Sequence, residues 1–313
     1  MSTAAAGPFT GVIPPVVTPL TEEGAVDTAS LERLVGHLIE SGVSGLFALG
    51  SSGETAYLTH EQQETVLETV IGAAAGQVPV LAGAIETATS RVVERARVAQ
   101  KAGAAGIVAT APFYTRTHAG ELAPHFRAVA AALEVPLFAY DVPVCVHTKL
   151  EPGLLLQLAA EGVLAGVKDS SGDDVSFRKL LLGARTLGGR RGFSALTGHE
   201  VVVDGMLLAG ADGVVPGLGN VDPRGYVRLY EAARRGDWAT ARAEQDRLAA
   251  LFALVDAVEP GTASGTTAGL GGFKTALALL GLIDTPAVSA PMRPHTPAET
   301  ARVRACLEGA GLL

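Results

Sequence analysis

Eight short apolar runs, each followed by a longer segment of helical period, constrain the fold of this chain more than any other feature. The runs are rich in Val, Ile, Leu and Ala, and they lie at residues 11–19, 45–50, 78–84, 106–110, 135–140, 164–168, 192–198 and 212–217. Their hydrophobicity is continuous rather than alternating. Such runs indicate strands that are buried on both faces, as in a parallel sheet.

The segments between the runs place apolar residues at i, i+3, i+4 and i+7, which is the spacing of one helix face. Clear examples are residues 28–42, 59–76, 88–103 and 119–133, and several begin near Thr, Ser or Asp. Strand and helix alternate from residue 11 to residue 236, close to the ~250 residues of a (β/α)8 barrel. We therefore predict an α/β fold, a (β/α)8 TIM barrel over residues 1–236.

An open, doubly wound sheet is the alternative fold. The G-x-G-x-x-G fingerprint of that fold is missing after the first run, where GVIPPVVTPL stands. From residue 237 onward helical patterns continue without strand signals, so residues 237–313 are expected to form a C-terminal helical extension on the barrel. The Gly-, Thr- and Ser-rich stretch 261–272 is expected to be an exposed loop between two helices of that extension.

Composition narrows the class of protein. The chain has 313 residues, 48% of them hydrophobic, which is enough for a sizeable core. Its net charge of −8 argues against nucleic acids and anionic membranes as partners. No apolar run reaches the roughly 18 residues that span a bilayer, and the start, MSTAAAGPFT, does not look like a signal peptide. We therefore expect a soluble, cytoplasmic protein. Its two cysteines, Cys145 and Cys306, cannot build a disulfide framework and are expected to be reduced thiols.

Active sites of such barrels lie at the carboxyl ends of the strands, and Lys168 ends the sixth run there, in GVKDSSGD. Only five of the 24 basic residues are lysines, which favours a role that needs an amine. Desolvation at the mouth of an apolar barrel lowers the pKa of a lysine, and the neutral amine can then form an imine with a ketone. The alternative is a lysine that caps the strand and pairs with Asp169 in solvent.

Hydroxyl groups are expected at the same rim. Tyr140 ends the fifth run, Tyr114 follows the fourth, and Ser51 and Ser52 follow the second, in GSSGE. Imine formation and C–C bond chemistry both move protons, and a chain of Tyr140, Ser51 and Tyr114 could relay them. The backbone N–H groups and serines of GSSGE could hold a carboxylate. Equally, each tyrosine could be an ordinary strand-end residue, and GSSGE an ordinary loop.

A metal-dependent aldolase is the other chemistry that the rim could support. His147 and the pair His199–Glu200 follow strand ends, but they lack H-x-H, H-E-x-x-H or a comparable ligand spacing. We therefore expect no metal and no cofactor, and we interpret His199 as a substrate contact or its support. Cys145 has no evident base beside it and is interpreted as a small, partly buried thiol.

Four motifs together resemble those of the dihydrodipicolinate synthase and N-acetylneuraminate lyase family of class I pyruvate-dependent aldolases and lyases. GSSGE is similar to the family's G-[ST]-[ST]-G-E, APFY to P-[YF]-Y, YDVP to Y-[ND]-[VI]-P, and VKDSSGD to [IV]-K-[DE]-[AS]-[ST]-G-D. The resemblance covers nearly the whole chain. It implies the barrel fold and a reaction through an imine with pyruvate or a related 2-oxo acid.

The resemblance also implies roles for matched residues. Lys168 would form the imine, Tyr140 would transfer protons, and Ser51 with Tyr114 would complete the hydroxyl relay. Members of the family are usually homotetramers, built as dimers of dimers, in which the tyrosine matched by Tyr114 reaches across a subunit interface. The substrate-binding set that is expected here is Ser51, Ser52, Gly198, Val215, Cys145 and His199.

The chain departs from the family's pattern at two places. Dihydrodipicolinate synthases follow Y-N-V-P with Ser-Arg-Thr-Gly, and that arginine grips the carboxylate of aspartate semialdehyde. Cys145 stands in the arginine's place and cannot form a bidentate, charge-assisted clamp. At the family's lysine feedback site only the histidine is retained. The matched positions read His60, Gln63, Thr87, Arg91 and Phe113.

Three functions remain open on the sequence. The favoured one is a class I aldolase or lyase that acts with pyruvate and an aldehyde, on a 2-keto-3-deoxy sugar acid or a similar hydroxy-oxo acid. The second is dihydrodipicolinate synthase itself, that is, 4-hydroxy-tetrahydrodipicolinate synthase, which uses aspartate semialdehyde. A dehydratase or hydratase-aldolase that works through the same lysine imine is a related possibility. The third is a non-catalytic barrel that binds a 2-oxo acid.

Overall fold

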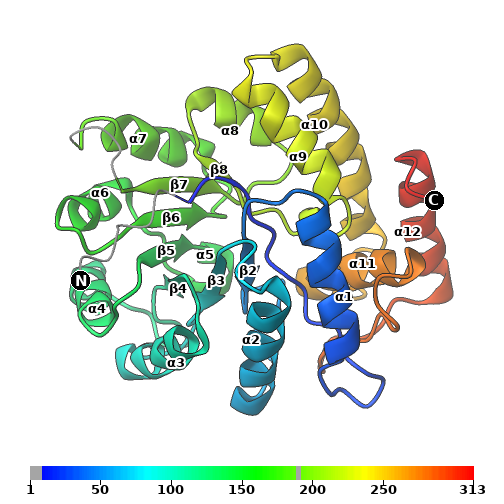
Figure 1. The fold of residues 1–313 in the computed structure, drawn as a ribbon, viewed down its shortest axis with the longest axis horizontal. Helices are drawn as coiled ribbons and strands as arrows, with labels where there is room; N and C mark the ends of the chain where they lie inside the picture. Colours follow the sequence, from blue (N-terminus) through cyan, green and yellow to red (C-terminus); the bar gives the residue numbers. More distant parts are fainter. Residues whose placement is uncertain (1–8, 188–191) are drawn as a thin grey trace.

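A ring of eight parallel strands surrounded by helices forms the centre of the computed structural model, which describes residues 9–187 and 192–313 (Figure 1). The strands are β1 (Gly11–Val12), β2 (Leu46–Ala48), β3 (Val80–Gly83), β4 (Gly106–Thr110), β5 (Leu137–Asp141), β6 (Gly166–Asp169), β7 (Ser194–Thr197) and β8 (Gly213–Val214). All eight coincide with the apolar runs of the sequence.

Hydrogen bonds close the strands into a barrel. The strand order is β1-β8-β7-β6-β5-β4-β3-β2, and every neighbouring pair is parallel. The gap between β1 and β2 is bridged by the residues that follow β1, because Val16 N donates to Phe47 O at 2.9 Å and Phe47 N donates to Pro14 O at 3.0 Å. The predicted TIM barrel is confirmed, and the doubly wound alternative is excluded.

Helices cover the outside of the ring. They are α1 (Thr28–Glu40), α2 (His60–Ala74), α3 (Thr89–Ala102), α4 (Ala119–Ala130), α6 (Pro152–Ala160), α7 (Asp174–Ala184), α8 (Val203–Ala209) and α9 (Pro223–Arg234). Two short helices, α5 (Pro143–Val146) and η1 (Leu218–Asn220), follow the carboxyl ends of β5 and β8. Local sequence signals set where they begin. Asp27 caps α1 by accepting from Ser30 N, and Thr59 forms a capping box with Gln62 at the start of α2.

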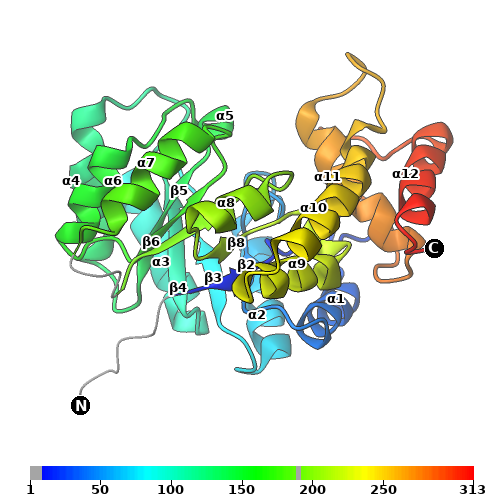
Figure 2. The same ribbon diagram turned by 90° about the horizontal axis from the view of Figure 1, so that it is seen from above.

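After α9 the chain is helical, with α10 (Trp238–Phe252), η2 (Ala253–Asp256), α11 (Gly265–Leu279) and α12 (Pro297–Gly309). Figures 1 and 2 show α10, α11 and α12 gathered on one side of the barrel. We propose the same division that the sequence suggests, a barrel over residues 1–236 and a helical extension over 237–313. The first eight residues of that barrel segment lie outside the described residues.

The expectation of an exposed loop over residues 261–272 holds only for residues 261–264 and was wrong for the rest, because α11 begins at Gly265. Ser264 caps it by accepting from Thr267 N at 3.1 Å. The last two glycines of the stretch, Gly271 and Gly272, permit close packing of the helix. A Cβ on Gly272 would lie 2.9 Å from the backbone oxygen of Leu254, in the preceding helical turn.

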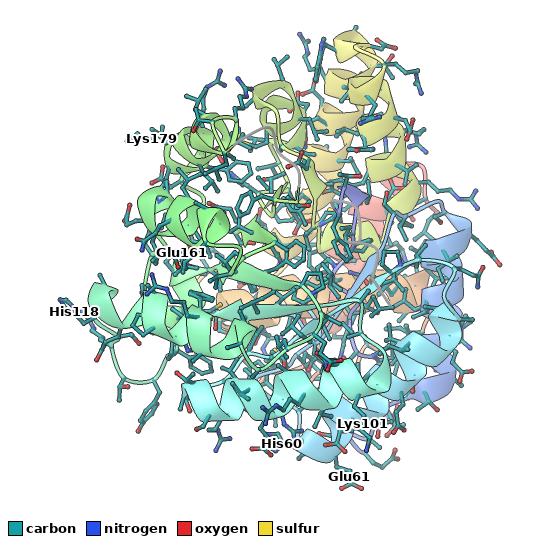
Figure 3. All side chains as sticks on the ribbon, turned by 60° about the vertical axis from the view of Figure 1, so that its left-hand side comes forward. His60, Glu61, Lys101, His118, Glu161 and Lys179 are labelled. Atoms are coloured by element: carbon teal, nitrogen blue, oxygen red, sulfur yellow. The ribbon has the colours of Figure 1, made fainter. Side chains whose placement is uncertain are left out.

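Polar side chains lie on the outer surface of the helices and at their ends. Figure 3 shows six of them projecting away from the barrel, and all six residues are exposed: His60, Glu61, Lys101, His118, Glu161 and Lys179. Within the described part of the chain, no helix combines the length and hydrophobicity needed to cross a membrane.

Candidate active site

Strand register brings Thr110, Tyr140 and Lys168 side by side. Thr110 of β4 pairs with Tyr140 of β5, and Tyr140 pairs with Lys168 of β6. Because successive side chains of a strand alternate between its two faces, residues in register on neighbouring strands point to the same face. All three are buried, so their side chains form one layer at the carboxyl end of the barrel.

Lys168 is directed into the barrel mouth. Its side chain lies among aromatic rings, with Nζ 4.2 Å from the ring centroid of Tyr140 and 5.1 Å from that of Phe47. The residue is only 6% exposed. Asp169, the partner that a strand-capping lysine would use, instead accepts from Ser171 N at 2.8 Å and lies 3.8 Å from Lys149. This arrangement favours the imine-forming interpretation of Lys168 over the strand-capping one.

Ser51 and Tyr140 are adjacent across the mouth, with 3.4 Å between Ser51 Oγ and Tyr140 Oη. That separation is at the long end of a hydrogen bond, and the pair is close enough to exchange a proton once a substrate tightens it. Tyr114, in contrast, lies on the loop after β4 and is 92% exposed, with a φ of +77°. Within one chain the structure therefore brings together Lys168, Tyr140 and Ser51 but leaves Tyr114 outside.

The GSSGE turn that carries Ser51 and Ser52 is held from both sides. Glu54 N donates to Ser51 O at 3.1 Å, and Thr18 Oγ1 donates to Gly53 O at 2.9 Å. Glu54 itself has a φ of +60°, a left-handed conformation that a glutamate adopts only when its surroundings compensate. The turn is thus a fixed structure rather than a flexible loop.

The compensating contacts of Glu54 come from the C-terminal extension. Its carboxylate forms an ion pair with Lys274 of α11 and accepts from Ser289 N at 2.8 Å. Lys274 also donates to Ala287 O at 2.7 Å. Glu54 and Lys274 are both fully buried, and burial lowers the pKa of the Lys274 amine. Sequence patterns gave no sign of this pairing, because the two residues are far apart along the chain.

Beside Ser51 a cavity of about 320 Å3 opens toward solvent. Hydroxyl and apolar groups line it, and none of its lining residues is acidic or basic. The lining residues are Ser51, Thr55, Ala56, Tyr57, Ile85, Thr110, Phe113, Val142, Val144, Cys145, Val146 and Thr266. The cavity therefore offers no charged group to a substrate.

Cys145 lies on the short helix α5 that borders this cavity. The residue is exposed, not partly buried as the sequence suggested. The protein around its sulfur still desolvates the thiol and raises its pKa, and Lys168 together with a hydrogen bond from Ser51 opposes part of that rise. The segment that carries it is anchored by Asp141, whose carboxylate accepts from Leu150 N at 3.0 Å and forms an ion pair with Lys149. The structure thus places Cys145 at the mouth of the barrel, near the lysine and the serine.

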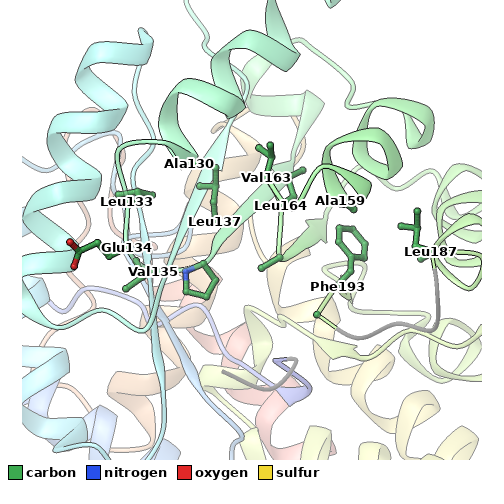
Figure 4. Close-up of a pocket in the computed structure, with 15 residues that line it drawn as sticks. Ala130, Leu133, Glu134, Val135, Leu137, Ala159, Val163, Leu164, Leu187 and Phe193 are labelled. Atoms are coloured by element: carbon green, nitrogen blue, oxygen red, sulfur yellow. The ribbon is translucent and has the colours of Figure 1, made fainter. Parts of the chain in front are cut away.

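The larger cavity of about 360 Å3 lies at the opposite end of the barrel, where β5, β6 and β7 begin (Figure 4). Its walls are formed mostly by apolar side chains from α4, α6 and the strand starts. Among the described residues that line it, Glu134 is the single ionisable one. The described part of its wall holds no lysine, hydroxyl pair or other reactive cluster, so we do not assign the chemistry to this cavity.

The remaining predicted residues lie around the ends of β7 and β8. Gly198 N donates to Asp169 O at 2.6 Å, and a Cβ at Gly198 would come within 2.1 Å of Ser170 Oγ. Val215 is buried, and its N–H donates to Thr197 O. His199 lies 3.1 Å from Asp174 through its Nδ1.

Comparison with known proteins decides the family. The model of the dihydrodipicolinate synthetase family matches residues 8–310. The chain belongs to the dihydrodipicolinate synthetase family. The 4-hydroxy-tetrahydrodipicolinate synthase of Phenylobacterium zucineum (strain HLK1) is 34% identical over 308 residues, which cover 97% of this chain and 98% of the relative. The resemblance inferred from the four motifs is confirmed, and the protein is an enzyme of the class I aldolase and lyase group.

Two solved structures of the family show the same fold. YagE, a prophage protein of the dihydrodipicolinic acid synthase family from E. coli K12, solved in complex with pyruvate, has a TM-score of 0.90 at 30% identity and covers 97% of this chain and 99% of its own. The dihydrodipicolinate synthase of Bacteroides thetaiotaomicron has a TM-score of 0.89 at 31% identity, with coverage of 97% and 99%.

Glu200 is a further residue near the strand ends of this dihydrodipicolinate synthetase family member. From the sequence it was considered only together with His199, as a pair of metal ligands. Burial raises the pKa of its carboxyl to about 7, and backbone hydrogen bonds, Lys168 and Tyr226 oppose the rise. Its Oε2 accepts from Leu218 N at 2.7 Å, at the start of η1. Its position directly after His199 was the signal that could have placed it near the strand end.

Two of the five positions matched to the family's lysine feedback site, His60 and Arg91, contact Glu86. His60 Nε2 lies 3.2 Å from Glu86 Oε1, and Arg91 Nε donates to Glu86 Oε2 at 2.9 Å. Gln63 is buried and donates to the backbone oxygen of Thr55. The polar groups of His60, Arg91 and Gln63 thus all contact other groups of the same chain. This agrees with a degraded effector site.

Proposed function

We propose that this enzyme forms an imine between Lys168 and pyruvate, or a related 2-oxo acid, and makes or cleaves the adjacent C–C bond. The observation that carries the proposal is the burial of Lys168 at the barrel mouth, 4.2 Å from the Tyr140 ring and in strand register with it. An amine held at this position is placed to attack a ketone that binds in the barrel mouth.

In the proposed sequence the lysine nitrogen attacks C2 of the oxo acid and water leaves, giving an imine. Loss of a C3 proton gives an enamine, whose C3 attacks an aldehyde carbon; cleavage runs through the same steps in reverse, and hydrolysis frees the lysine. Tyr140 and Ser51, 3.4 Å apart, would carry protons between the reacting oxygen atoms and solvent. The turn with Ser51 and Ser52 would hold the substrate carboxylate, and Gly198 and Val215 would line the same pocket.

For the second reactant we propose a 2-keto-3-deoxy sugar acid or a similar hydroxy-oxo acid, which is cleaved to pyruvate and an uncharged aldehyde. Support comes from the cavity beside Ser51, whose lining residues include no arginine or lysine, and from Cys145 in its wall. A dihydrodipicolinate synthase must bind a second carboxylate, and a thiol does not replace a bidentate arginine. Condensation of pyruvate with aspartate semialdehyde is the alternative.

Parallel assays of the purified enzyme test this choice. Release of pyruvate from a panel of 2-keto-3-deoxy sugar acids is measured beside condensation of pyruvate with aspartate semialdehyde. Faster turnover of a sugar acid supports the proposal, and faster turnover of the semialdehyde establishes the alternative. If neither reaction occurs although pyruvate binds, the non-catalytic oxo-acid-binding barrel is favoured.

We propose that the enzyme assembles as a homotetramer, a dimer of dimers, in which Tyr114 of one subunit completes the relay of another. Support comes from the 92% exposure of this tyrosine on a single chain, which leaves its ring and hydroxyl available to a neighbouring subunit. Sedimentation velocity gives the mass of the assembly. A monomer with full activity, or a Tyr114→Phe variant with unchanged kcat, would refute the proposal.

A further inference from the structure

Lys149 is a charged residue that the proposed reaction does not use, and it lies against two buried carboxylates. It forms an ion pair with Asp141, and its Nζ lies 3.8 Å from Asp169 Oδ2. Asp141 is 0% exposed and Asp169 is 5% exposed. Strand register places the two aspartates side by side, at the ends of β5 and β6. Because neighbouring carboxylates repel each other, the cation of Lys149 stabilises the charged form of both.

Among the described residues, Lys149 is the single cation that pairs with either aspartate. The other contacts of their carboxylates come from backbone N–H groups and a hydroxyl. Burial raises the pKa of Asp141 and Asp169 adds to the rise, whereas Lys149 and the N–H of Leu150 oppose it. The charge on Asp141 therefore depends on Lys149.

The cluster of Asp141, Asp169 and Lys149 lies directly behind the reacting side chains. Asp141 follows Tyr140 on β5, and Asp169 follows Lys168 on β6. Because successive side chains of a strand alternate between its faces, the two aspartates lie on the opposite face of the sheet from Tyr140 and Lys168. Lys149 thus connects the ends of the two strands that carry the tyrosine and the lysine.

The same cluster closes the loop of residues 142–148. Asp141 precedes this loop, and its carboxylate holds the residues that follow it, by accepting from Leu150 N at 3.0 Å and by pairing with Lys149. The loop borders the cavity of about 320 Å3, which is lined by its residues Val142, Val144, Cys145 and Val146.

Few contacts hold the tip of this loop. Val144 is 79% exposed, and Cys145 and His147 are exposed as well. Segments with little buried apolar surface open easily, so the position of this loop depends on the anchors at its ends. A buried ion pair adds little stability, because desolvation of the two charges offsets most of their attraction, but it can fix one conformation.

We propose that Lys149 is a positioning residue for the aldehyde substrate, because it joins Asp141 to Asp169 and thereby holds the loop of residues 142–148 at the edge of the cavity beside Ser51. The inference rests on the proposed imine chemistry and deepens it. It assigns the shape of the aldehyde's pocket to an ion pair that does not itself touch the substrate.

The test compares Lys149→Met, which removes the charge, with Lys149→Arg, which keeps it. A double variant, Lys149→Met with Asp141→Asn, removes both charges of the pair, and its asparagine can still accept from Leu150 N. Exposed Lys179→Met is the control. Each protein is treated with iodoacetamide, and peptide mass spectrometry gives separate rates for Cys145 on the loop and for Cys306 on α12.

In Lys149→Met we expect alkylation of Cys145 to become at least fivefold faster, because release of the loop removes the surroundings that raise the pKa of its thiol. The rate at Cys306 should change less than twofold. Both rates in Lys149→Arg and in Lys179→Met should stay within twofold of those in the unaltered enzyme. The double variant should be more stable in urea than Lys149→Met and still show the faster alkylation, because no cation then joins β5 to β6.

Activity gives the second readout. The rate at which pyruvate and borohydride modify Lys168 should stay within twofold in Lys149→Met, while KM for glyceraldehyde or aspartate semialdehyde rises at least fivefold. An unchanged KM, a Cys145 rate within twofold of the original, or an equal rise at Cys306 would overturn the role of Lys149. If the unaltered enzyme forms no borohydride-stable adduct, the proposed function fails, and the alkylation rates still decide whether Lys149 holds the loop.

Discussion

Replacing Lys274 by methionine tests whether the C-terminal extension holds the active-site turn through one buried ion pair. The substitution keeps the length of the side chain and removes its charge. Glu54 would then be left fully buried without the ion pair, and its carboxylate would keep the hydrogen bond from the N–H of Ser289. Because that carboxylate belongs to the turn that carries Ser51, both stability and activity should respond.

The expected magnitude follows from the burial. Breaking a buried ion pair by removing one partner costs about 3–5 kcal/mol, because an uncompensated charge remains inside. The two side chains are only 1% and 0% exposed, so solvent screening does not reduce this cost. For a chain of this size the loss corresponds to a fall in Tm on the order of 10 °C. Exposed Lys101→Met is the matched control, and its effect should stay within about 0.5 kcal/mol.

Urea unfolding followed by circular dichroism measures the change, with Lys274→Met, Glu54→Gln and the double variant in one cycle. In the double variant a neutral glutamine can still accept from Ser289 N, and the buried charge is gone. We therefore expect the double variant to be more stable than Lys274→Met alone. A loss below about 1 kcal/mol in Lys274→Met, or losses that simply add, would show that the pair does not hold the turn.

Two further predictions concern residues at the barrel mouth. Burial raises the pKa of Glu200 to about 7 from its ordinary 4.5. Between these two pH values the folded state binds a proton that the unfolded state has lost. The free energy of unfolding therefore falls as the pH rises from 4.5 to 7, by about 3 kcal/mol at most. In urea titrations Glu200→Gln should lack this part of the pH dependence; parallel curves for the two proteins would contradict the assignment. Cys145→Arg should raise kcat/KM for aspartate semialdehyde at least tenfold relative to the unaltered enzyme, by supplying a charge-assisted bond to its carboxylate, and an unchanged value would show that the position does not face the electrophile.

Local patterns were sufficient to predict the barrel. Continuous apolar runs and the helical segments between them specify parallel strands with crossover helices, and the eight strands lie where the runs are. The ends of these strands then placed Lys168, Tyr140 and Ser51 at one rim, because parallel strands of a barrel all end on the same side.

Features that depend on contacts between distant segments were not predictable in this way. The pairing of Lys274 with Glu54 joins residues that no periodicity links, and the stretch 261–272 was expected to be a loop because its glycines resemble turn residues. Gly272 packs closely against Leu254, and this contact becomes visible only when α11 is in place. The burial of the Thr110 hydroxyl without a partner among the described residues likewise arises only in the folded chain.

The most direct test of the central claim is to incubate the enzyme with pyruvate and borohydride and to map the modified peptide by mass spectrometry. Lys168→Ala and the exposed Lys179→Ala serve as matched variants. The account predicts a reduced pyruvyl adduct on Lys168 in the unaltered enzyme and in Lys179→Ala, and none in Lys168→Ala. An adduct on another lysine, or no adduct on a folded protein that turns over its substrate, would contradict the imine mechanism.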